Sequence, residues 1–96
     1  MVVVRGVNVY PSAVEEIIRG CGGIAEYRVH VQQQQALAEL SVEIEPEPAA
    51  NPDAISQKLA GRFQDLLSLR VAVRAVSNLP RFDMKAKRWV REAQGA

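Results

Sequence analysis

Apolar residues recur along this chain with two different periods, and each period marks a different kind of element. The first helical pattern follows Pro11, where Ser12 and Glu15 have the spacing of a capping box. Glycines at positions 20, 22 and 23 are expected to end this helix. Its apolar face repeats at the three- and four-residue spacing of an α-helix, through Val14, Ile17, Ile18 and Cys21.

A second helical pattern lies in the second half of the chain. Asn51-Pro52-Asp53 offers a cap, a proline at the first helical position and an acidic residue in the first turn. The helix is expected to reach about Ser68, and Gly61 inside it weakens it by about 1 kcal/mol relative to alanine. Its apolar stripe is predicted to consist of Ile55, Leu59, Phe63, Leu66 and Leu67.

Strict alternation of apolar and polar residues marks two strands in the middle of the chain. Residues 26–31 and 38–45 alternate, and the polar residues 32–35 between them are interpreted as a turn. The pattern predicts an antiparallel hairpin with one apolar face. His30 falls on the polar face and is interpreted as a surface histidine.

Extended segments are also expected at both ends. The β-branched runs 2–4 and 7–9 flank Arg5-Gly6 and predict an N-terminal ribbon with the glycine at its turn. Residues 69–76 predict a last strand, and residues 86–92 a short helix within the tail that follows.

The order of elements is strand, helix, strand, strand, helix, strand. One antiparallel sheet with both helices on one face is the economical way to bury these apolar stripes. We therefore predict a single α+β domain over residues 1–96, a ferredoxin-like βαββαβ fold with an added N-terminal ribbon and a basic C-terminal tail.

Composition narrows the class of protein. With 48% apolar and 24% charged residues in 96, the chain is typical of a soluble globular domain with one core. No apolar run approaches the roughly 20 residues of a membrane span. A single cysteine excludes an internal disulfide and is typical of the reducing cytoplasm. With one histidine besides, no metal site is predicted.

Positive charge is concentrated at the C-terminal end. Residues 80–96 hold five basic and two acidic residues, a net charge of +3, whereas the preceding 79 hold seven basic and nine acidic, a net charge of −2. Such a distribution favours an anionic ligand near this end.

Several function classes share this order of elements. An RNA-recognition module needs exposed aromatic residues on its central strands, whereas these strands carry valines and acids with Tyr27 alone, so no nucleic-acid partner is expected. A stand-alone small-molecule-binding regulatory module stays open, because Gly6 at the first turn suits it. It leaves the basic tail unexplained.

Two stretches of the chain carry a family resemblance. Val3-Val4-Arg5-Gly6-Val7-Asn8-Val9-Tyr10-Pro11-Ser12-Ala13-Val14-Glu15-Glu16 closely resembles the motif that opens the C-terminal domain of adenylate-forming enzymes. Leu79-Pro80-Arg81-Phe82-Asp83-Met84-Lys85-Ala86-Lys87-Arg88 resembles the lysine motif that closes that domain. Together, over essentially the whole chain, they look like phenylacetate–coenzyme A ligase and its relatives, including the coenzyme F390 synthetases.

The resemblance implies an AMP-forming acid–thiol ligase that works in two steps. ATP and an aryl or acyl carboxylic acid give an acyl-adenylate, from which the thiol of coenzyme A then displaces AMP. The chain would be the mobile C-terminal lid domain, inactive alone. A large N-terminal adenylation domain, which binds ATP, Mg²⁺ and the acid and forms most of a homodimer contact, would precede Met1 in a longer protein. The identity of the acid is not readable from this segment.

By the same resemblance, Lys85 is the catalytic lysine of the first step. Its ammonium would offset the repulsion between carboxylate and triphosphate and stabilise charge that develops on the α-phosphate. In the second step the face with Arg5 and Gly6 would turn inward, and Gly6 would let the pantetheine arm pass close to the backbone. The cations expected to attract the phosphates of coenzyme A are Arg5, Arg81, Lys87 and Arg88.

The lysine motif departs from the family pattern at two positions. Phe82 stands where the family has a small hydroxyl residue, and Met84 where it has a glycine directly before the lysine. An alternative alignment makes Lys87 the active lysine. Lys85 is preferred because its spacing to Arg88 matches the usual lysine-x-x-arginine ending.

Overall fold

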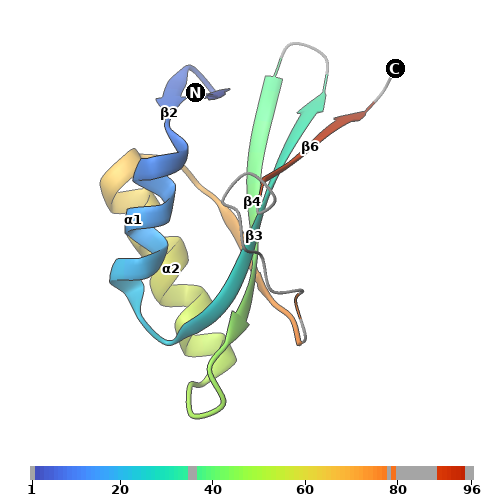
Figure 1. The fold of residues 1–96 in the computed structure, drawn as a ribbon. Helices are drawn as coiled ribbons and strands as arrows, with labels where there is room; N and C mark the ends of the chain where they lie inside the picture. The colour runs from blue at the N-terminus through green and yellow to red at the C-terminus, as the bar shows by residue number, and fades with distance from the viewer. Residues whose placement is uncertain (1, 35–36, 78, 80–88, 95–96) are drawn as a thin grey trace.

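A computed structural model describes residues 2–34, 37–77, 79 and 89–94 of the chain. The helices and strands follow one another as shown in Figure 1. Their bounds are β1 (Val2–Val4), β2 (Val7–Val9), α1 (Pro11–Cys21), β3 (Ile24–Gln34), β4 (Leu37–Pro46), α2 (Pro52–Leu67), β5 (Ala72–Ala75) and β6 (Trp89–Gln94).

A four-stranded sheet in the order β5-β4-β3-β6 forms the centre of the domain, and β1 and β2 form a separate antiparallel ribbon. The predicted α+β, ferredoxin-like class is confirmed, but the sheet is not wholly antiparallel. β3 and β4 pair antiparallel, whereas β5 runs parallel to β4 and β6 runs parallel to β3. The connection through α2 explains the first parallel pair, because a helical crossover returns the chain to the same end of the sheet.

The end of the basic tail is a strand, so the short helix predicted over residues 86–92 is wrong for its described part. Trp89–Gln94 pairs with the edge of β3 from Val29↔Trp89 to Gln34↔Gln94. Aromatic and β-branched residues favour extended backbone, and an uncovered strand edge offers unpaired donors and acceptors. The pairing partner, which is distant in sequence, decided the conformation.

The central hairpin is longer than the alternation predicted. The β3–β4 ladder extends to Gln34↔Leu37, so Gln32, Gln33 and Gln34 belong to the strand and not to a turn. Residues 35–36, where the turn itself falls, lie outside the described residues. Backbone pairing does not require apolar side chains, which is why a polar run concealed the strand end.

The start of α1 differs from the predicted capping box. Tyr10 occupies the N-cap position with extended backbone, and it makes no side-chain capping bond that the structure describes. Its carbonyl accepts hydrogen bonds from the amides of Ala13 and Val14 at 3.0 and 3.2 Å. Pro11 at the first helical position presets the backbone for the helix, so the start does not depend on Ser12. Gly22, at φ 75°, ends α1 as predicted.

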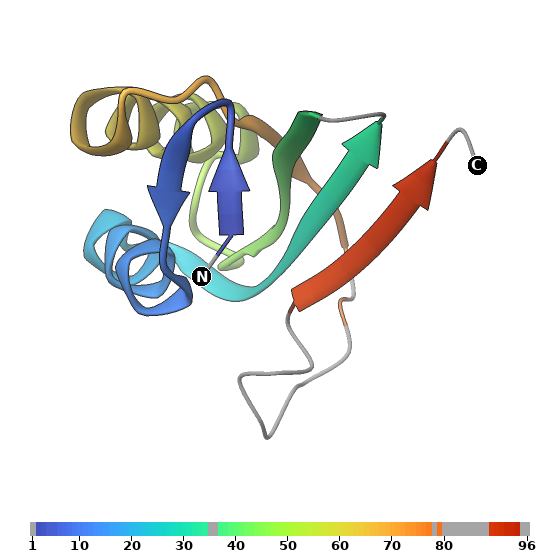
Figure 2. The same cartoon turned by 90° about the horizontal axis from the view of Figure 1, so that it is seen from above.

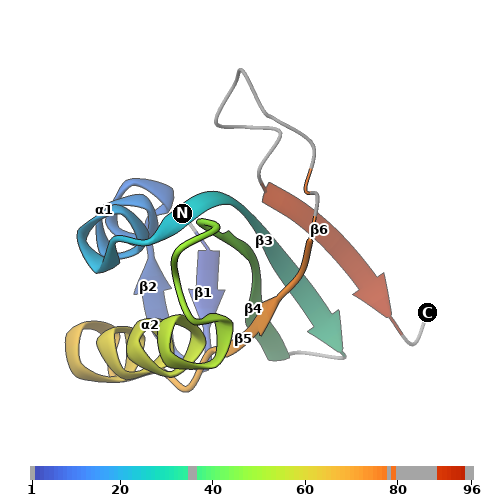
Figure 3. The same ribbon diagram turned by 90° about the horizontal axis from the view of Figure 1, so that it is seen from below.

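Both helices pack on one face of the sheet, and the ribbon β1–β2 lies at one end of the helix pair (Figures 2 and 3). The predicted face of α1 is buried, and so are Leu59 and Phe63 of α2. Leu66 is 59% exposed, so its place in the predicted stripe is wrong. Beneath the helices the core is completed by sheet residues Tyr27, Val29, Val31, Leu40, Val42 and Ile44.

Candidate functional site

The tip of the N-terminal ribbon is a tight two-residue turn formed by Arg5 and Gly6. Val4 and Val7 are paired on either side of it. Both turn residues have positive φ angles, 50° for Arg5 and 81° for Gly6. These are the signs of a type I′ hairpin, which twists in the same sense as the strands. Val4, next to the turn, and Val9, at the open end of the ribbon, are both buried, so the core holds the ribbon along its length.

Arg5 pairs with a carboxylate of the central sheet. Its guanidinium contacts Glu39 Oε1, and the two side chains are 59% and 50% exposed. An ion pair this exposed contributes about 0–1 kcal/mol to stability. The pair therefore orients Arg5 at the tip of the ribbon but holds it only weakly. An incoming anion could replace Glu39.

Gly6 is required by the backbone of the turn. A side chain at φ 81° would be strained, yet no described atom lies within 4 Å of the position its Cβ would take. The open space leaves room for a group to approach the backbone here. The close approach of a pantetheine arm stays a prediction.

The four remaining predicted site residues, Arg81, Lys85, Lys87 and Arg88, lie outside the described residues. Both flanks of that segment are described. Leu79 is 9% exposed and donates its backbone N–H to Glu45 Oε1 of β4 at 2.8 Å. On the other flank, Trp89 begins β6 and is packed against the core.

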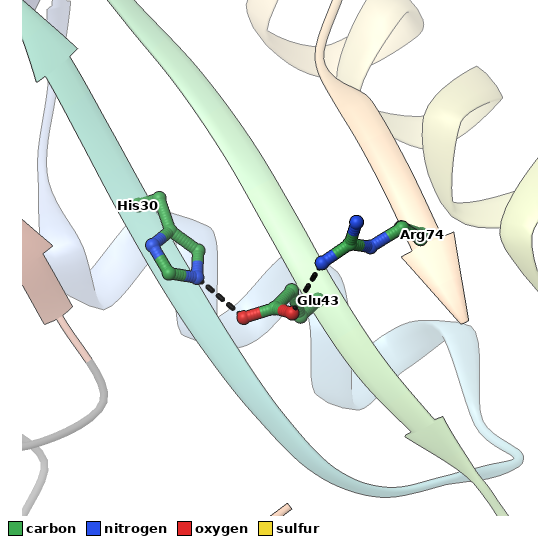
Figure 4. A network of polar contacts seen from close by, with 3 residues as sticks. All are labelled: His30, Glu43 and Arg74. Carbon is green, nitrogen blue, oxygen red and sulfur yellow. Dashed lines mark hydrogen bonds and ion pairs between the residues drawn. The ribbon is translucent and has the colours of Figure 1, made fainter. Parts of the chain in front are cut away.

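A charged network that the sequence analysis did not anticipate crosses the sheet face opposite the helices (Figure 4). Glu43 of β4 lies between His30 of β3 and Arg74 of β5. His30 Nε2 is 2.5 Å from Glu43 Oε1, and Arg74 Nη2 donates to Glu43 Oε2 at 2.8 Å. The hydrogen bond from Arg74, and next that to His30, hold the pKa of the Glu43 carboxyl below its ordinary value of 4.5.

The network borders a shallow hollow of about 400 Å³ on this face. The lining consists of the three network residues together with Gln32, Ser41, Val42, Ala72 and Val73. Within the hollow, Glu43 is bonded on both sides, to His30 and to Arg74. The arrangement joins β3, β4 and β5 electrostatically.

His30 was predicted to be a surface histidine, but its side chain is 17% exposed. Alternation correctly placed His30 and Glu43 on the polar face of the hairpin. Whether two such residues meet depends on the register, and the register depends on the hairpin turn. A two-residue turn assigned at positions 35–36 would have placed His30 opposite Ser41, diagonally next to Glu43.

Two classes of site find no support in the described part of the chain. No described group of three or more histidine, cysteine or acidic residues could hold a metal ion. Among the same residues, neither helix has the length and apolar character needed to cross a membrane.

The sequence matches the family described as the AMP-binding enzyme C-terminal domain over residues 6–92. The match begins at Gly6, within the ribbon turn, and it includes the lysine motif and all but the last two residues of the central sheet. The chain belongs to this family. No curated protein sequence matches it.

Solved structures with the same fold include two of 2-hydroxyisobutyryl-CoA ligase. One is in complex with 2-HIB-AMP and CoA in the thioesterification state, with 27% identity and a TM-score of 0.79, over 95% of this chain and 21% of that one. The other, with 2-HIB-AMP in the postadenylation state, also has 27% identity, with a TM-score of 0.81 over 96% of this chain and 21% of that one. This chain thus spans about a fifth of that ligase.

A domain of phenylacetate-coenzyme A ligase from Bacteroides vulgatus ATCC 8482 shares the fold as well. It is 20% identical with a TM-score of 0.77, over 98% of this chain and 93% of that chain. At this identity the likeness concerns the fold alone.

Proposed function

We propose that this chain is the mobile C-terminal domain of an ATP-dependent, AMP-forming aryl- or acyl-CoA ligase of the phenylacetate–CoA ligase type. The observation that carries the proposal is the family match, which covers residues 6–92 and so spans nearly all of both motifs. A large N-terminal domain of the same protein supplies the binding sites for ATP, Mg²⁺ and the carboxylic acid. The likeness to about a fifth of a CoA ligase chain supports this division.

In the first step, a carboxylate oxygen attacks the α-phosphorus of ATP and the bond to pyrophosphate breaks. Lys85 presents its ammonium between the two anionic reactants, where it stabilises charge developing on the bridging and α-phosphate oxygens. A point charge on a flexible side chain suits a group that is inserted for one step and withdrawn for the next.

In the second step, the thiolate of coenzyme A attacks the acyl carbon and AMP leaves. The ribbon turn now faces the active site. Arg5, which is exposed and paired with Glu39, exchanges that carboxylate for a phosphate of coenzyme A. The open space beside Gly6 lets the pantetheine arm run along the backbone.

The decisive experiment separates the two steps in the full-length ligase. Lys85→Ala should abolish formation of acyl-adenylate, measured by pyrophosphate exchange, and spare the conversion of preformed adenylate to thioester. Arg70→Ala, which removes one exposed positive charge elsewhere, serves as the control and should leave both steps near the wild-type rate.

Equal loss of both steps in Lys85→Ala, or of neither, would contradict the assignment. If Lys87→Ala loses adenylation selectively and Lys85→Ala does not, Lys87 is the catalytic lysine, as in the alternative alignment. The family match favours the ligase domain over the regulatory module, which the Gly6 turn alone would also suit.

A further inference from the structure

The Arg5–Glu39 ion pair joins two residues whose backbones are each fixed by buried neighbours. Arg5 directly follows Val4 of β1, which is buried, and Glu39 lies on β4 between the buried Ala38 and Leu40. The two charged residues are 34 positions apart in sequence, and the strand β1 contacts β4 in the fold. Each side chain therefore starts from a fixed point, and the carboxylate is held beside the guanidinium.

The position of the ribbon depends little on this pair. Val4 and Val9, one on each strand of the ribbon, belong to the buried core. Burial of two valines outweighs an ion pair between side chains that are 59% and 50% exposed, because solvent screens exposed charges. The ion pair therefore adds little to the attachment of the ribbon.

A carboxylate beside the guanidinium of Arg5 competes with every other anion for it. Because Glu39 belongs to the same molecule, it is present at a high effective concentration. A phosphate can still replace it, since phosphate makes strong, bidentate hydrogen bonds to a guanidinium. The observed affinity for that phosphate is reduced, however, by the fraction of molecules in which Arg5 is already paired.

The same competition applies to the substrate and the product of the second step. Transfer of the acyl group to the thiol leaves the phosphates of coenzyme A unchanged. A contact between Arg5 and a phosphate therefore binds coenzyme A and acyl-CoA equally, and a tighter contact would retain the product as strongly as it captures the substrate.

We infer that Glu39 is an internal competitor for Arg5, which weakens the binding of coenzyme A and of the acyl-CoA product by the same factor and so favours product release. This inference rests on the proposed function, in which Arg5 binds a phosphate of coenzyme A. Glu39 takes no part in making or breaking bonds. It acts through Arg5 and sets the affinity of that contact.

The test replaces the carboxylate with a neutral amide of the same size in the full-length ligase. In Glu39→Gln, the KM for coenzyme A and the inhibition constant of the acyl-CoA product should each fall about two- to fivefold, as expected for the loss of an exposed ion pair. Adenylation, measured by pyrophosphate exchange, and the KM for ATP should stay unchanged, because Arg5 is proposed to act in the second step only.

A matched control is Glu47→Gln, which removes the same charge from an exposed position just after β4. It should leave both constants for coenzyme A compounds unchanged. The inference is overturned if neither constant falls in Glu39→Gln, if only one of them falls, or if Glu47→Gln lowers them as much. In those cases Glu39 does not compete for a contact that coenzyme A and acyl-CoA share.

A double-mutant cycle with Arg5→Asn shows whether Glu39 acts through Arg5. In the Arg5→Asn background, Glu39→Gln should have no further effect on either constant. An equal decrease with and without Arg5 would mean that Glu39 repels the phosphates directly, which contradicts the inference.

The single variants separate the two proposals. If Arg5→Asn leaves the KM for coenzyme A unchanged, the proposed role of Arg5 fails, and the role of Glu39 fails with it. If Arg5→Asn raises that KM while Glu39→Gln does not lower it, Arg5 keeps its proposed role and the inference about Glu39 alone is wrong.

Discussion

At the scale of single residues, Arg5 has a backbone conformation that is unfavourable for an arginine. Its φ of 50° lies in the left-handed region, which costs an ordinary side chain about 1–2 kcal/mol. Asparagine tolerates this region better, and Asn-Gly is the preferred pair for a type I′ turn. Because Arg5 and Glu39 are both at least half exposed, their ion pair contributes little to the stability of the fold. The proposed role of Arg5, binding a phosphate of coenzyme A, would account for an arginine at this position.

We predict that Arg5→Asn changes folding and coenzyme A use in different ways. The relieved turn offsets the lost pair with Glu39, so the free energy of unfolding should stay within about 1 kcal/mol of the wild type. Loss of a charged contact to phosphate should raise the KM for coenzyme A about tenfold. Chemical denaturation and steady-state kinetics of the full-length ligase measure the two effects.

Arg70→Asn provides a matched control for Arg5→Asn, because Arg70 is an exposed arginine outside the ribbon, in the segment between α2 and β5. It should leave the KM for coenzyme A unchanged. An unchanged KM in Arg5→Asn itself would exclude Arg5 from the coenzyme A site.

At the scale of elements, the network centred on Glu43 joins three strands on the open face of the sheet. Its carboxylate is favoured in the folded state, so its folded pKa lies below the ordinary value of 4.5. Stability from such a group is fully present above that ordinary value and is lost as the pH falls through the lower, folded pKa. The network therefore stabilises the sheet at neutral pH and fails in acid.

We predict that Glu43→Gln lowers the free energy of unfolding by about 1 kcal/mol at pH 7, since Arg74 is largely exposed and its pairing is screened by solvent. At pH 3 the difference from the wild type should shrink, because the wild-type carboxyl then takes up a proton. Urea denaturation at both pH values measures the change. Asp65 is an exposed acid on α2, and Asp65→Asn should show neither effect. If Glu43→Gln lowers the free energy of unfolding equally at both pH values, protonation of Glu43 is not coupled to stability.

The elements could be predicted where local pattern decides them. The buried face of α1, the proline start of α2 and the apolar face of the hairpin all follow from periodicity and capping residues. The strand β6 could not be predicted, because its conformation depends on the free edge of β3 about 60 residues earlier. The parallel pairing of β4 and β5 depends in the same way on the path of the chain around α2.

Less of the candidate site than of the helices and strands could be predicted from the sequence. Arg5 and Gly6 were found through motif resemblance, and the structure adds the turn that holds them. The alternation of residues 38–45 does not reveal that Glu45 accepts a hydrogen bond from the Leu79 amide, because that amide lies 34 residues away. A sequence shows which side chains a strand exposes, but hydrogen bonds to distant backbone depend on the tertiary fold.

At the scale of the whole molecule, one strand contacts both the ribbon turn and the first residue of the lysine motif. Arg5 contacts Glu39 of β4, and the Leu79 amide donates to Glu45 of the same strand. These two carboxylates lie six residues apart on the same strand, roughly 20 Å along it. In the proposed function the domain rotates between the two steps, and these two points on one strand would then move together.

We predict that the 96-residue chain produced alone folds but does not make acyl-CoA. The core buried between two helices and a sheet should give cooperative thermal unfolding, with a free energy of about 5–14 kcal/mol for this length. The described hollows are shallow surface features, so ATP, an aryl acid and coenzyme A should yield no thioester by mass spectrometry. The full-length ligase is the positive control. Thioester formation by the chain alone would contradict the proposal that the N-terminal domain supplies the binding sites for ATP and the acid. Dimerisation together with calorimetric binding of an amino acid would instead support the regulatory alternative.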